Sequence, residues 1–200
     1  MNFCEVMQQT LYIIAGCNGA GKTTASYTVL PEILDCREYV NADEIAKGLS
    51  PFNPESVAIE AGRLMLERID YLMTAGVSFS IETTLATKSY VNLVRRAHKQ
   101  GYNVKLLFFW LESPEMAKLR VAERVAKGGH NIPEDVIERR YYAGIRNLFN
   151  LFMNEVDYWA IFMNTKKPMT SIAVGGMAFE KHIIEVELYN KMVEIWQNKR

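Results

Sequence analysis

The sequence is poor in the residues that build disulfide frameworks and zinc sites. It has three cysteines, Cys4, Cys17 and Cys36, and three scattered histidines. An odd number of cysteines without C-x-x-C spacing predicts neither a disulfide framework nor a structural zinc site.

The sequence also lacks an excess of charge and a long apolar run. Basic and acidic residues number 23 each, which argues against general attraction to nucleic acid or to an anionic membrane. The longest apolar run, 106–111, is far too short to span a bilayer and is typical of a buried strand. The N-terminal segment MNFCEVMQQ has no signal-peptide pattern. We therefore expect a soluble cytoplasmic protein with no nucleic-acid or membrane partner.

Short β-rich segments alternate with longer segments of helical periodicity. Hydrophobic residues make up 49% of the 200 residues, enough to build one core. We expect strands at 11–16, 37–41, 77–82, 104–111, 158–164 and 171–175. We expect helices at 54–75, 87–100, 114–127, 133–154 and about 179–198. This alternation predicts a single three-layer α/β/α domain over residues 1–200, with a mostly parallel sheet.

The segment GCNGAGKTT follows the first predicted strand and precedes a helix. It matches G-x-x-x-x-G-K-[ST], a loop whose backbone N–H groups surround phosphate at a helix N-terminus. We expect Lys22 to reach the β- and γ-phosphates and the Thr23 hydroxyl to coordinate Mg²⁺. The predicted nucleotide-binding residues are Gly16, Asn18, Gly19, Ala20, Gly21, Lys22, Thr23 and Thr24. A glycine-rich turn with an incidental lysine is the alternative.

Other motifs separate a small kinase from other nucleotide-binding proteins. A GTPase needs an N-K-x-D motif, and the NTKK segment at 164–167 lacks the aspartate. The third predicted strand ends in FSIETT, without the aspartate typical of a large motor ATPase. The chain length and a short helical lid favour a small-molecule kinase with ATP as donor. Asn164 is the candidate for adenine recognition.

Two acidic residues follow predicted strands at the edge where open α/β sheets bind ligands. Asp43, just past the second predicted strand, is placed to accept the proton of an attacking hydroxyl or to orient that hydroxyl. The alternative, compatible with the first, is that Asp43 is the N-cap of a short helix from Glu44. Glu82 is followed by Thr83 and Thr84, and it is a candidate to hold a magnesium-bound water or an acceptor hydroxyl. An ordinary acidic residue at a strand end is the alternative.

Positive charge gathers on one face of the helix predicted at 114–127. Arg120, Arg124 and Lys127 are spaced i, i+4 and i+7, so they share that face. The residues predicted to pack in the core from the opposite face are Leu119, Val121, Ala122 and Val125. This pattern favours a lid that closes over phosphates, and a solvated helical face is the alternative.

A Gly-Gly bend at 128–129 joins this helix to a second basic one, which begins near Pro133 and carries Arg139 and Arg140. The two helices form a predicted lid at about 114–146. Positioned cations stabilise the charge that develops in phosphoryl transfer, and one arginine is worth ~10³–10⁵ in rate. The predicted catalytic residues are Lys22, Asp43, Arg120, Arg124 and Arg140, with Arg139 as an alternative to Arg140.

Together these segments resemble the zeta-toxin-like P-loop kinases, specifically their bacterial predicted-ATPase branch. The resemblance spans about 11–175 and rests on GCNGAGKTT, NADEIAKGLSPFNPE, SFSIETTL, LRVAERVAKGGHNIPEDVIERRY and DYWAIFMNT. It implies a P-loop NTPase fold of the nucleoside-kinase type, with a five- or six-stranded sheet. The best-known members phosphorylate a sugar hydroxyl of UDP-N-acetylglucosamine, which blocks cell-wall synthesis.

The resemblance also implies roles for individual residues. Lys22 and Thr23 match the P-loop pair, Asp43 matches the base after the second strand, and Arg120 or Arg124 matches a lid arginine. The implied acceptor-binding residues are Asp43, Glu82, and Thr83 or Thr84.

The sequence departs from the family pattern at two places. Cys17 replaces the proline usual after the first loop glycine. We expect this change to be harmless, and the alternative is a loop sensitive to thiol reagents, because a helix N-terminus favours the thiolate. His130 stands where well-studied toxins place a second arginine, so either Arg139 or Arg140 takes that role or the acceptor differs. We expect His130 itself to pack or cap. The arginine and Gly-His lid also resembles that of gluconate-type kinases.

The leading hypothesis is a kinase that uses ATP and Mg²⁺ to phosphorylate a hydroxyl of a small molecule or nucleotide sugar. The alternatives are a gluconate-type sugar kinase and a nucleotide-binding switch or interaction module, in which Asp43 and Glu82 are structural. The last predicted helix is amphipathic, and its apolar face packs on the sheet or docks an antitoxin-like protein or a second copy. That face consists of Ile184, Leu188, Met192, Ile195 and Trp196.

Overall fold

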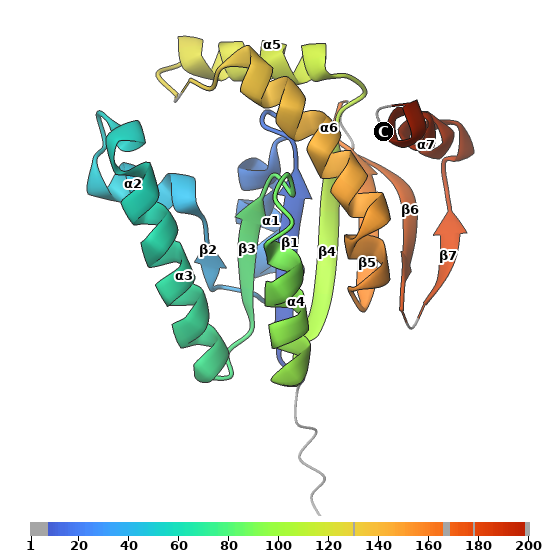
Figure 1. Cartoon of the computed structure of the whole chain (residues 1–200), viewed down its shortest axis with the longest axis horizontal. Coiled ribbons are helices and arrows are strands. Elements are labelled where there is room, and N and C mark those ends of the chain that lie inside the picture. The colour runs from blue at the N-terminus through green and yellow to red at the C-terminus, as the bar shows by residue number, and fades with distance from the viewer. Residues whose placement is uncertain (1–7, 130, 166–168, 178, 199–200) are drawn as a thin grey trace, which may run out of the picture.

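A seven-stranded sheet forms the centre of the molecule (Figure 1). The computed structural model describes residues 8–129, 131–165, 169–177 and 179–198, so the prediction for His130 lies outside the described residues. The strands are β1 (Thr10–Gly16), β2 (Tyr39–Val40), β3 (Phe79–Thr83), β4 (Asn103–Trp110), β5 (Tyr158–Met163), β6 (Thr170–Gly176) and β7 (Phe179–Ile183). Their order across the sheet is β2-β3-β1-β4-β5-β6-β7.

The sheet is mostly parallel, as predicted. β2, β3, β1, β4 and β5 run in one direction, whereas β6 and β7 are each antiparallel to the preceding strand. β1 is buried at every position, because helices cover both of its faces and its sequence TLYIIAG is apolar along almost its whole length. The predicted α/β/α architecture is confirmed, and its sheet has seven strands where five or six were predicted.

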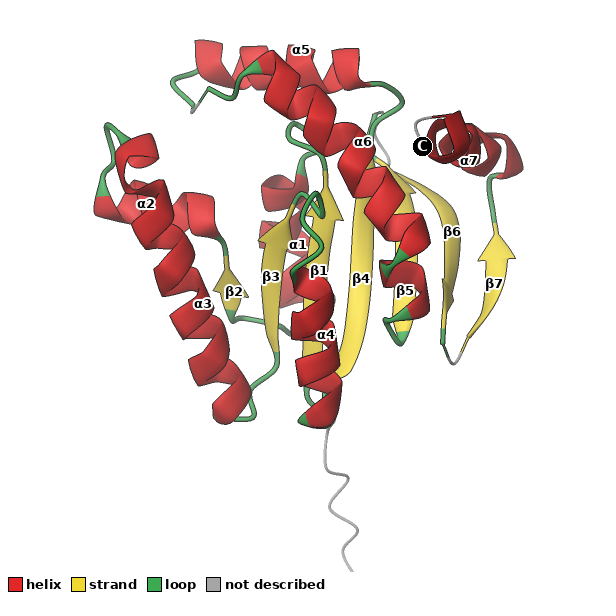
Figure 2. Cartoon of the chain, viewed as in Figure 1, coloured by secondary structure: helices red, strands yellow, loops and turns green. Residues whose placement is uncertain are grey.

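Helices cover both faces of the sheet. They are α1 (Lys22–Glu32), α2 (Ala42–Leu49), α3 (Ala58–Thr74), α4 (Tyr90–Lys99), α5 (Pro114–Ala126), α6 (Glu134–Asn150) and α7 (Val186–Asn198), with 3₁₀ turns η1 (Pro54–Val57) and η2 (Phe152–Asn154). Figure 2 shows α4 and α6 in front of the sheet, α1 behind it, and α5 across the carboxyl ends of the parallel strands. None of the helices in the described part of the chain is both long and apolar enough to cross a membrane.

The C-terminal segment differs from its prediction. Residues 179–183 form β7 rather than the start of a helix, and Ile184 precedes α7 with 46% of its surface exposed. β7 has no buried position, so its sequence carries no alternating pattern that would mark it as a strand. Within α7, Met192 is fully buried and Trp196 stacks on Phe149 of α6. This packing favours the alternative in which α7 is the outer layer of the fold.

Candidate active site

The predicted phosphate-binding loop joins the carboxyl end of β1 to the first turn of α1. Gly16 has φ 141°, and a Cβ there would lie 2.2 Å from the carbonyl oxygen of Phe109 in β4. Gly21 has φ 78° and is the N-cap of α1. Only glycine adopts these conformations without strain, so the loop can bring the unpaired N–H groups of α1 close to the end of the sheet. Such groups bind phosphate.

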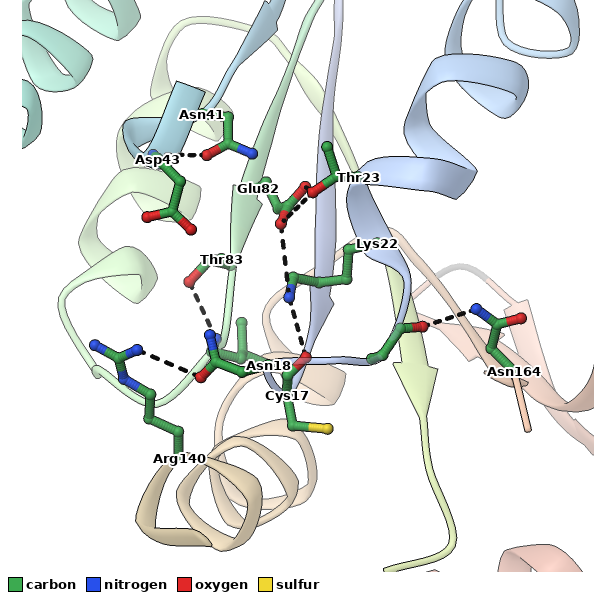
Figure 3. Close-up of polar contacts among 12 residues, drawn as sticks. Cys17, Asn18, Lys22, Thr23, Asn41, Asp43, Glu82, Thr83, Arg140 and Asn164 are labelled. Carbon is green, nitrogen blue, oxygen red and sulfur yellow. Dashed lines mark hydrogen bonds and ion pairs between the residues drawn. The ribbon is translucent and has the colours of Figure 1, made fainter. Parts of the chain in front are cut away.

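Lys22 and Thr23 both contact Glu82 of β3 (Figure 3). The Lys22 ammonium donates to the Cys17 carbonyl at 3.1 Å and lies 3.6 Å from Glu82 Oε1. The Thr23 hydroxyl donates to Glu82 Oε2 at 2.9 Å. The side chains of Lys22 and Glu82 are only 7% and 9% exposed, so water screens their charges little. Glu82 therefore lies on the phosphate side of the site.

Two polar residues that the sequence patterns did not indicate complete this cluster. Tyr39 of β2 donates its hydroxyl hydrogen to Glu82 Oε2 and accepts a hydrogen bond from Asn41 Nδ2 at 2.8 Å. Burial, followed by the nearby Glu82 charge, raises the pKa of Tyr39, so its hydroxyl stays protonated and able to donate. In the sequence, Tyr39 and Asn41 are marked only as two polar side chains shortly before Asp43.

Asp43 lies in the first turn of α2, which Asn41 caps. The Asn41 side-chain oxygen accepts a hydrogen bond from the Asp43 backbone N–H at 2.8 Å. The interpretation of Asp43 as the cap of a helix from Glu44 is therefore wrong, because α2 begins at Ala42. Within the described residues, the Asp43 carboxylate has no hydrogen bond or ion pair of its own.

Two adjoining cavities lie beside these residues. The first, of about 360 Å³, is bordered by the phosphate-binding loop and by Glu82, Thr83 and Thr84. The second, of about 380 Å³, lies between α2, η1 and α5. The residues that line both cavities are Thr23, Ala42, Asp43 and Arg124. A phosphoryl donor in the first cavity and an acceptor in the second would therefore meet beside the Asp43 carboxylate.

The predicted arginines take different positions. Arg120 lines neither of these two cavities and donates to the carbonyls of Gly19 at 3.5 Å and Thr165 at 3.1 Å. It thereby ties the phosphate-binding loop to the segment that follows β5. This geometry favours a role for Arg120 in positioning the loop, whereas direct contact with phosphate stays a prediction.

Arg124 and Arg140 both line the first cavity. The Arg140 guanidinium donates to Asn18 Oδ1 of the phosphate-binding loop at 3.3 Å (Figure 3). Arg139 is exposed and lines neither cavity. Of the two adjacent arginines, Arg140 is therefore the one placed to reach a nucleotide.

The core-facing side of α5 is narrower than predicted. Val121 is 2% exposed, but Leu119 is 59% exposed and Ala122 is also exposed. Because α5 lies across the ends of the strands instead of along a sheet face, only a stripe of Pro114, Ala117 and Val121 is buried. The prediction that Leu119 and Ala122 belong to the core is wrong.

Helix α6 is fixed to the sheet at its centre. The Tyr141 hydroxyl accepts from Trp110 Nε1 at 3.1 Å and donates to the Leu111 carbonyl at 2.8 Å. Asn147 Nδ2 donates to the Leu85 carbonyl at 2.8 Å. The predicted lid therefore contains one helix anchored in the core, α6, and one held mainly by a narrow stripe, α5.

Cys17 is not the reactive thiol that its position at a helix N-terminus suggested. The side chain is 5% exposed, and burial raises the pKa of Cys17 to about 11 in spite of the opposing effect of Lys22. A neutral, buried thiol is a poor nucleophile.

Asn164 also contacts the phosphate-binding loop. Its side-chain N–H donates to the Ala20 carbonyl at 2.8 Å (Figure 3). Adenine recognition by Asn164 stays a prediction.

The residues around Thr23 fit a nucleotide-bound magnesium ion. Across the described ranges, no group of three or more His, Cys, Asp or Glu side chains is placed to hold a metal ion. Magnesium at nucleotides needs fewer protein ligands, because phosphates and water supply most of its octahedral shell. The Thr23 hydroxyl, 2.9 Å from the Glu82 carboxylate, provides such a pair of oxygens.

Comparisons with known proteins show the family and the fold of this chain. The zeta toxin family model matches residues 3–158. An uncharacterised protein of Haemophilus influenzae is 29% identical over 136 residues, which cover 68% of this chain and 95% of that protein.

Solved structures share the fold at lower identity. The AvrRxo1-ORF1:-ORF2 structure with ATP has a TM-score of 0.74 at 19% identity, covering 94% of this chain and 64% of that chain. A structure from the PezAT chromosomal toxin–antitoxin system of Streptococcus pneumoniae has a TM-score of 0.64 at 17% identity, covering 96% and 87%. This chain thus spans less than two thirds of the AvrRxo1 chain. Since the family model matches well over half of the sequence, this chain belongs to the zeta toxin family.

Proposed function

We propose that the protein is an ATP-dependent phosphotransferase that phosphorylates a hydroxyl group of a small molecule. The observation that carries this proposal is the position of Asp43, whose carboxylate borders both cavities. The family relationship and the fold shared with an ATP-containing structure support ATP as the donor.

The proposed reaction is a direct transfer. The acceptor oxygen forms a bond to the γ-phosphorus, the bond to the β,γ-bridging oxygen breaks, and ADP leaves. The Asp43 carboxylate orients the acceptor hydroxyl and receives its proton. Lys22 and Arg140 lie beside the phosphate cavity and stabilise the charge on the phosphoryl oxygens. Thr23 and Glu82 would hold a magnesium ion, which would supply further positive charge to the phosphates when bound.

Within this proposal, a nucleotide sugar such as UDP-N-acetylglucosamine is the first acceptor to test, because the family resemblance implies it. Glu82, Thr83 and Thr84 all border the first cavity and none borders the second. A role for the two threonines in binding the acceptor therefore requires that the reacting hydroxyl enter the first cavity. An antitoxin-like protein partner and a cytoplasmic location also belong to the proposal. The partner is suggested by the similarity to PezAT.

The test is incubation with ATP, Mg²⁺ and a panel of UDP-N-acetylglucosamine, gluconate and nucleosides, read by mass spectrometry for added phosphate. Asp43→Asn should lower product formation by about 10²–10⁴-fold, while the affinity for ATP stays within a few-fold. Asp70→Asn is the matched control, because this exposed carboxylate pairs with Arg96 and borders neither cavity. ADP release without a phosphorylated product, equal in wild type and Asp43→Asn, would instead support the nucleotide-binding switch.

A further inference from the structure

The Glu82 carboxylate accepts hydrogen bonds from two hydroxyl groups and lies close to an ammonium group. Thr23 donates from α1 at 2.9 Å, Tyr39 donates from β2, and the Lys22 ammonium lies 3.6 Å away. Among these residues, Tyr39 alone comes from the edge of the sheet that carries α2 and Asp43.

Tyr39 also begins a chain of hydrogen bonds that ends at Asp43. The Asn41 side chain donates to the Tyr39 oxygen at 2.8 Å, and the Asn41 oxygen accepts from the Asp43 backbone N–H at 2.8 Å. Three consecutive hydrogen bonds therefore link Glu82, on the phosphate side of the site, to the first turn of the helix that carries Asp43.

The backbone alone gives this edge of the sheet little support. β2 consists of two residues, and its register with β3 is defined by Tyr39 opposite Ser80 and Val40 opposite Ile81. Such a short strand makes few ladder hydrogen bonds, so side-chain contacts must contribute to its position. Tyr39 is half-buried, and its ring packs edge-on against Tyr27 with centroids 6.0 Å apart.

We propose that Tyr39 is a positioning residue that holds Glu82 in the orientation needed for magnesium-nucleotide binding and fixes the Asp43 turn relative to it. The inference rests on the proposed function. Partners that orient metal-binding groups from outside their first coordination sphere typically contribute 10–100-fold in metal affinity or activity. Tyr39→Phe keeps the ring and its packing but removes the donor to Glu82 and the acceptor for Asn41.

The primary test measures binding without turnover. Thermal unfolding is followed with a non-hydrolysable ATP analogue at fixed concentration while Mg²⁺ is titrated. For Tyr39→Phe, the Mg²⁺ concentration that gives half of the nucleotide-dependent rise in melting temperature should increase about tenfold. Tyr27→Phe is the matched control, because it removes a neighbouring hydroxyl from a tyrosine that is 61% exposed. We expect Tyr27→Phe to titrate like the wild type.

A second variant tests the link to Asp43. Asn41→Ser keeps a side chain that caps α2 well but removes the hydrogen bond to Tyr39. It should shift the Mg²⁺ midpoint in the same direction but by less than Tyr39→Phe does, since the bond from Tyr39 to Glu82 remains.

The outcomes separate this inference from the proposed function. A purely structural role for Tyr39 would lower the melting temperature without nucleotide and leave the Mg²⁺ midpoint unchanged, which would overturn the inference alone. If Mg²⁺ had no effect on nucleotide binding by the wild-type protein, that result would overturn the inference together with the magnesium-dependent part of the proposed function. A shifted midpoint in Tyr39→Phe, with Tyr27→Phe unchanged, supports both.

Discussion

Replacing Tyr141 with phenylalanine should destabilise the protein while leaving the shape of its core intact. Tyr141 is 2% exposed, and its hydroxyl joins Trp110 Nε1 at 3.1 Å to the Leu111 carbonyl at 2.8 Å. The substitution leaves a buried donor and a buried acceptor without this partner. Each unsatisfied buried group costs about 1–3 kcal/mol, so the free energy of unfolding should fall by about 3 kcal/mol. For a chain of this size, the melting temperature should fall by roughly 6–12 °C.

Urea unfolding followed by tryptophan fluorescence measures this loss. Tyr189→Phe is the matched control, because Tyr189 is 8% exposed and no hydrogen bond from its hydroxyl occurs among the described residues. The control should lose less than about 0.5 kcal/mol. If Tyr141→Phe lost as little stability as the control, the reasoning would be refuted, because Trp110 and Leu111 would then have found other hydrogen-bond partners at no cost.

Two further predictions concern the phosphate-binding loop and the lid. Because burial raises the pKa of Cys17 from 9.0 to about 11, iodoacetamide at pH 8 should label the Cys17 peptide about 100-fold more slowly in the folded protein than in urea. Similar rates, measured by mass spectrometry, would contradict the burial of this thiol. In steady-state kinetics, Arg120→Ala should raise the KM for ATP about tenfold, because Arg120 holds the loop carbonyl of Gly19. Arg124→Ala should mainly lower kcat, by roughly 10²-fold or more, and an identical pattern in both variants would refute this division of roles.

The parts of the fold that the sequence predicts correctly are those with a strong local pattern. β1 and β4 are apolar runs in a parallel sheet, and the phosphate-binding loop needs glycines at particular backbone angles. β7 could not be predicted in the same way, because each of its side chains is at least partly exposed. Its position depends on pairing with β6 rather than on its own sequence.

The candidate site likewise contains residues that could be predicted from the sequence and residues that could not. Lys22 and Thr23 come from a motif with fixed spacing and Asp43 from its position just past a predicted strand, and the structure brings all three to one pair of cavities. The role of Tyr39 could not be predicted, since it depends on a hydrogen bond to Glu82 across 43 residues of sequence. Helical spacing correctly places Arg120 and Arg124 near each other, but it cannot distinguish the arginine that supports the loop from the one that faces the cavity.

The two edges of the sheet are formed by different parts of the chain. The edge formed by β2 carries Tyr39 and leads into the helix of Asp43, whereas β6, β7 and α7 lie beyond β5 at the other edge. The family match ends at residue 158, where β5 begins. The last three elements, β6, β7 and α7, lie beyond the matched segment. Deleting them would expose the unpaired edge of β5, so a chain shortened there should aggregate rather than yield a smaller soluble protein.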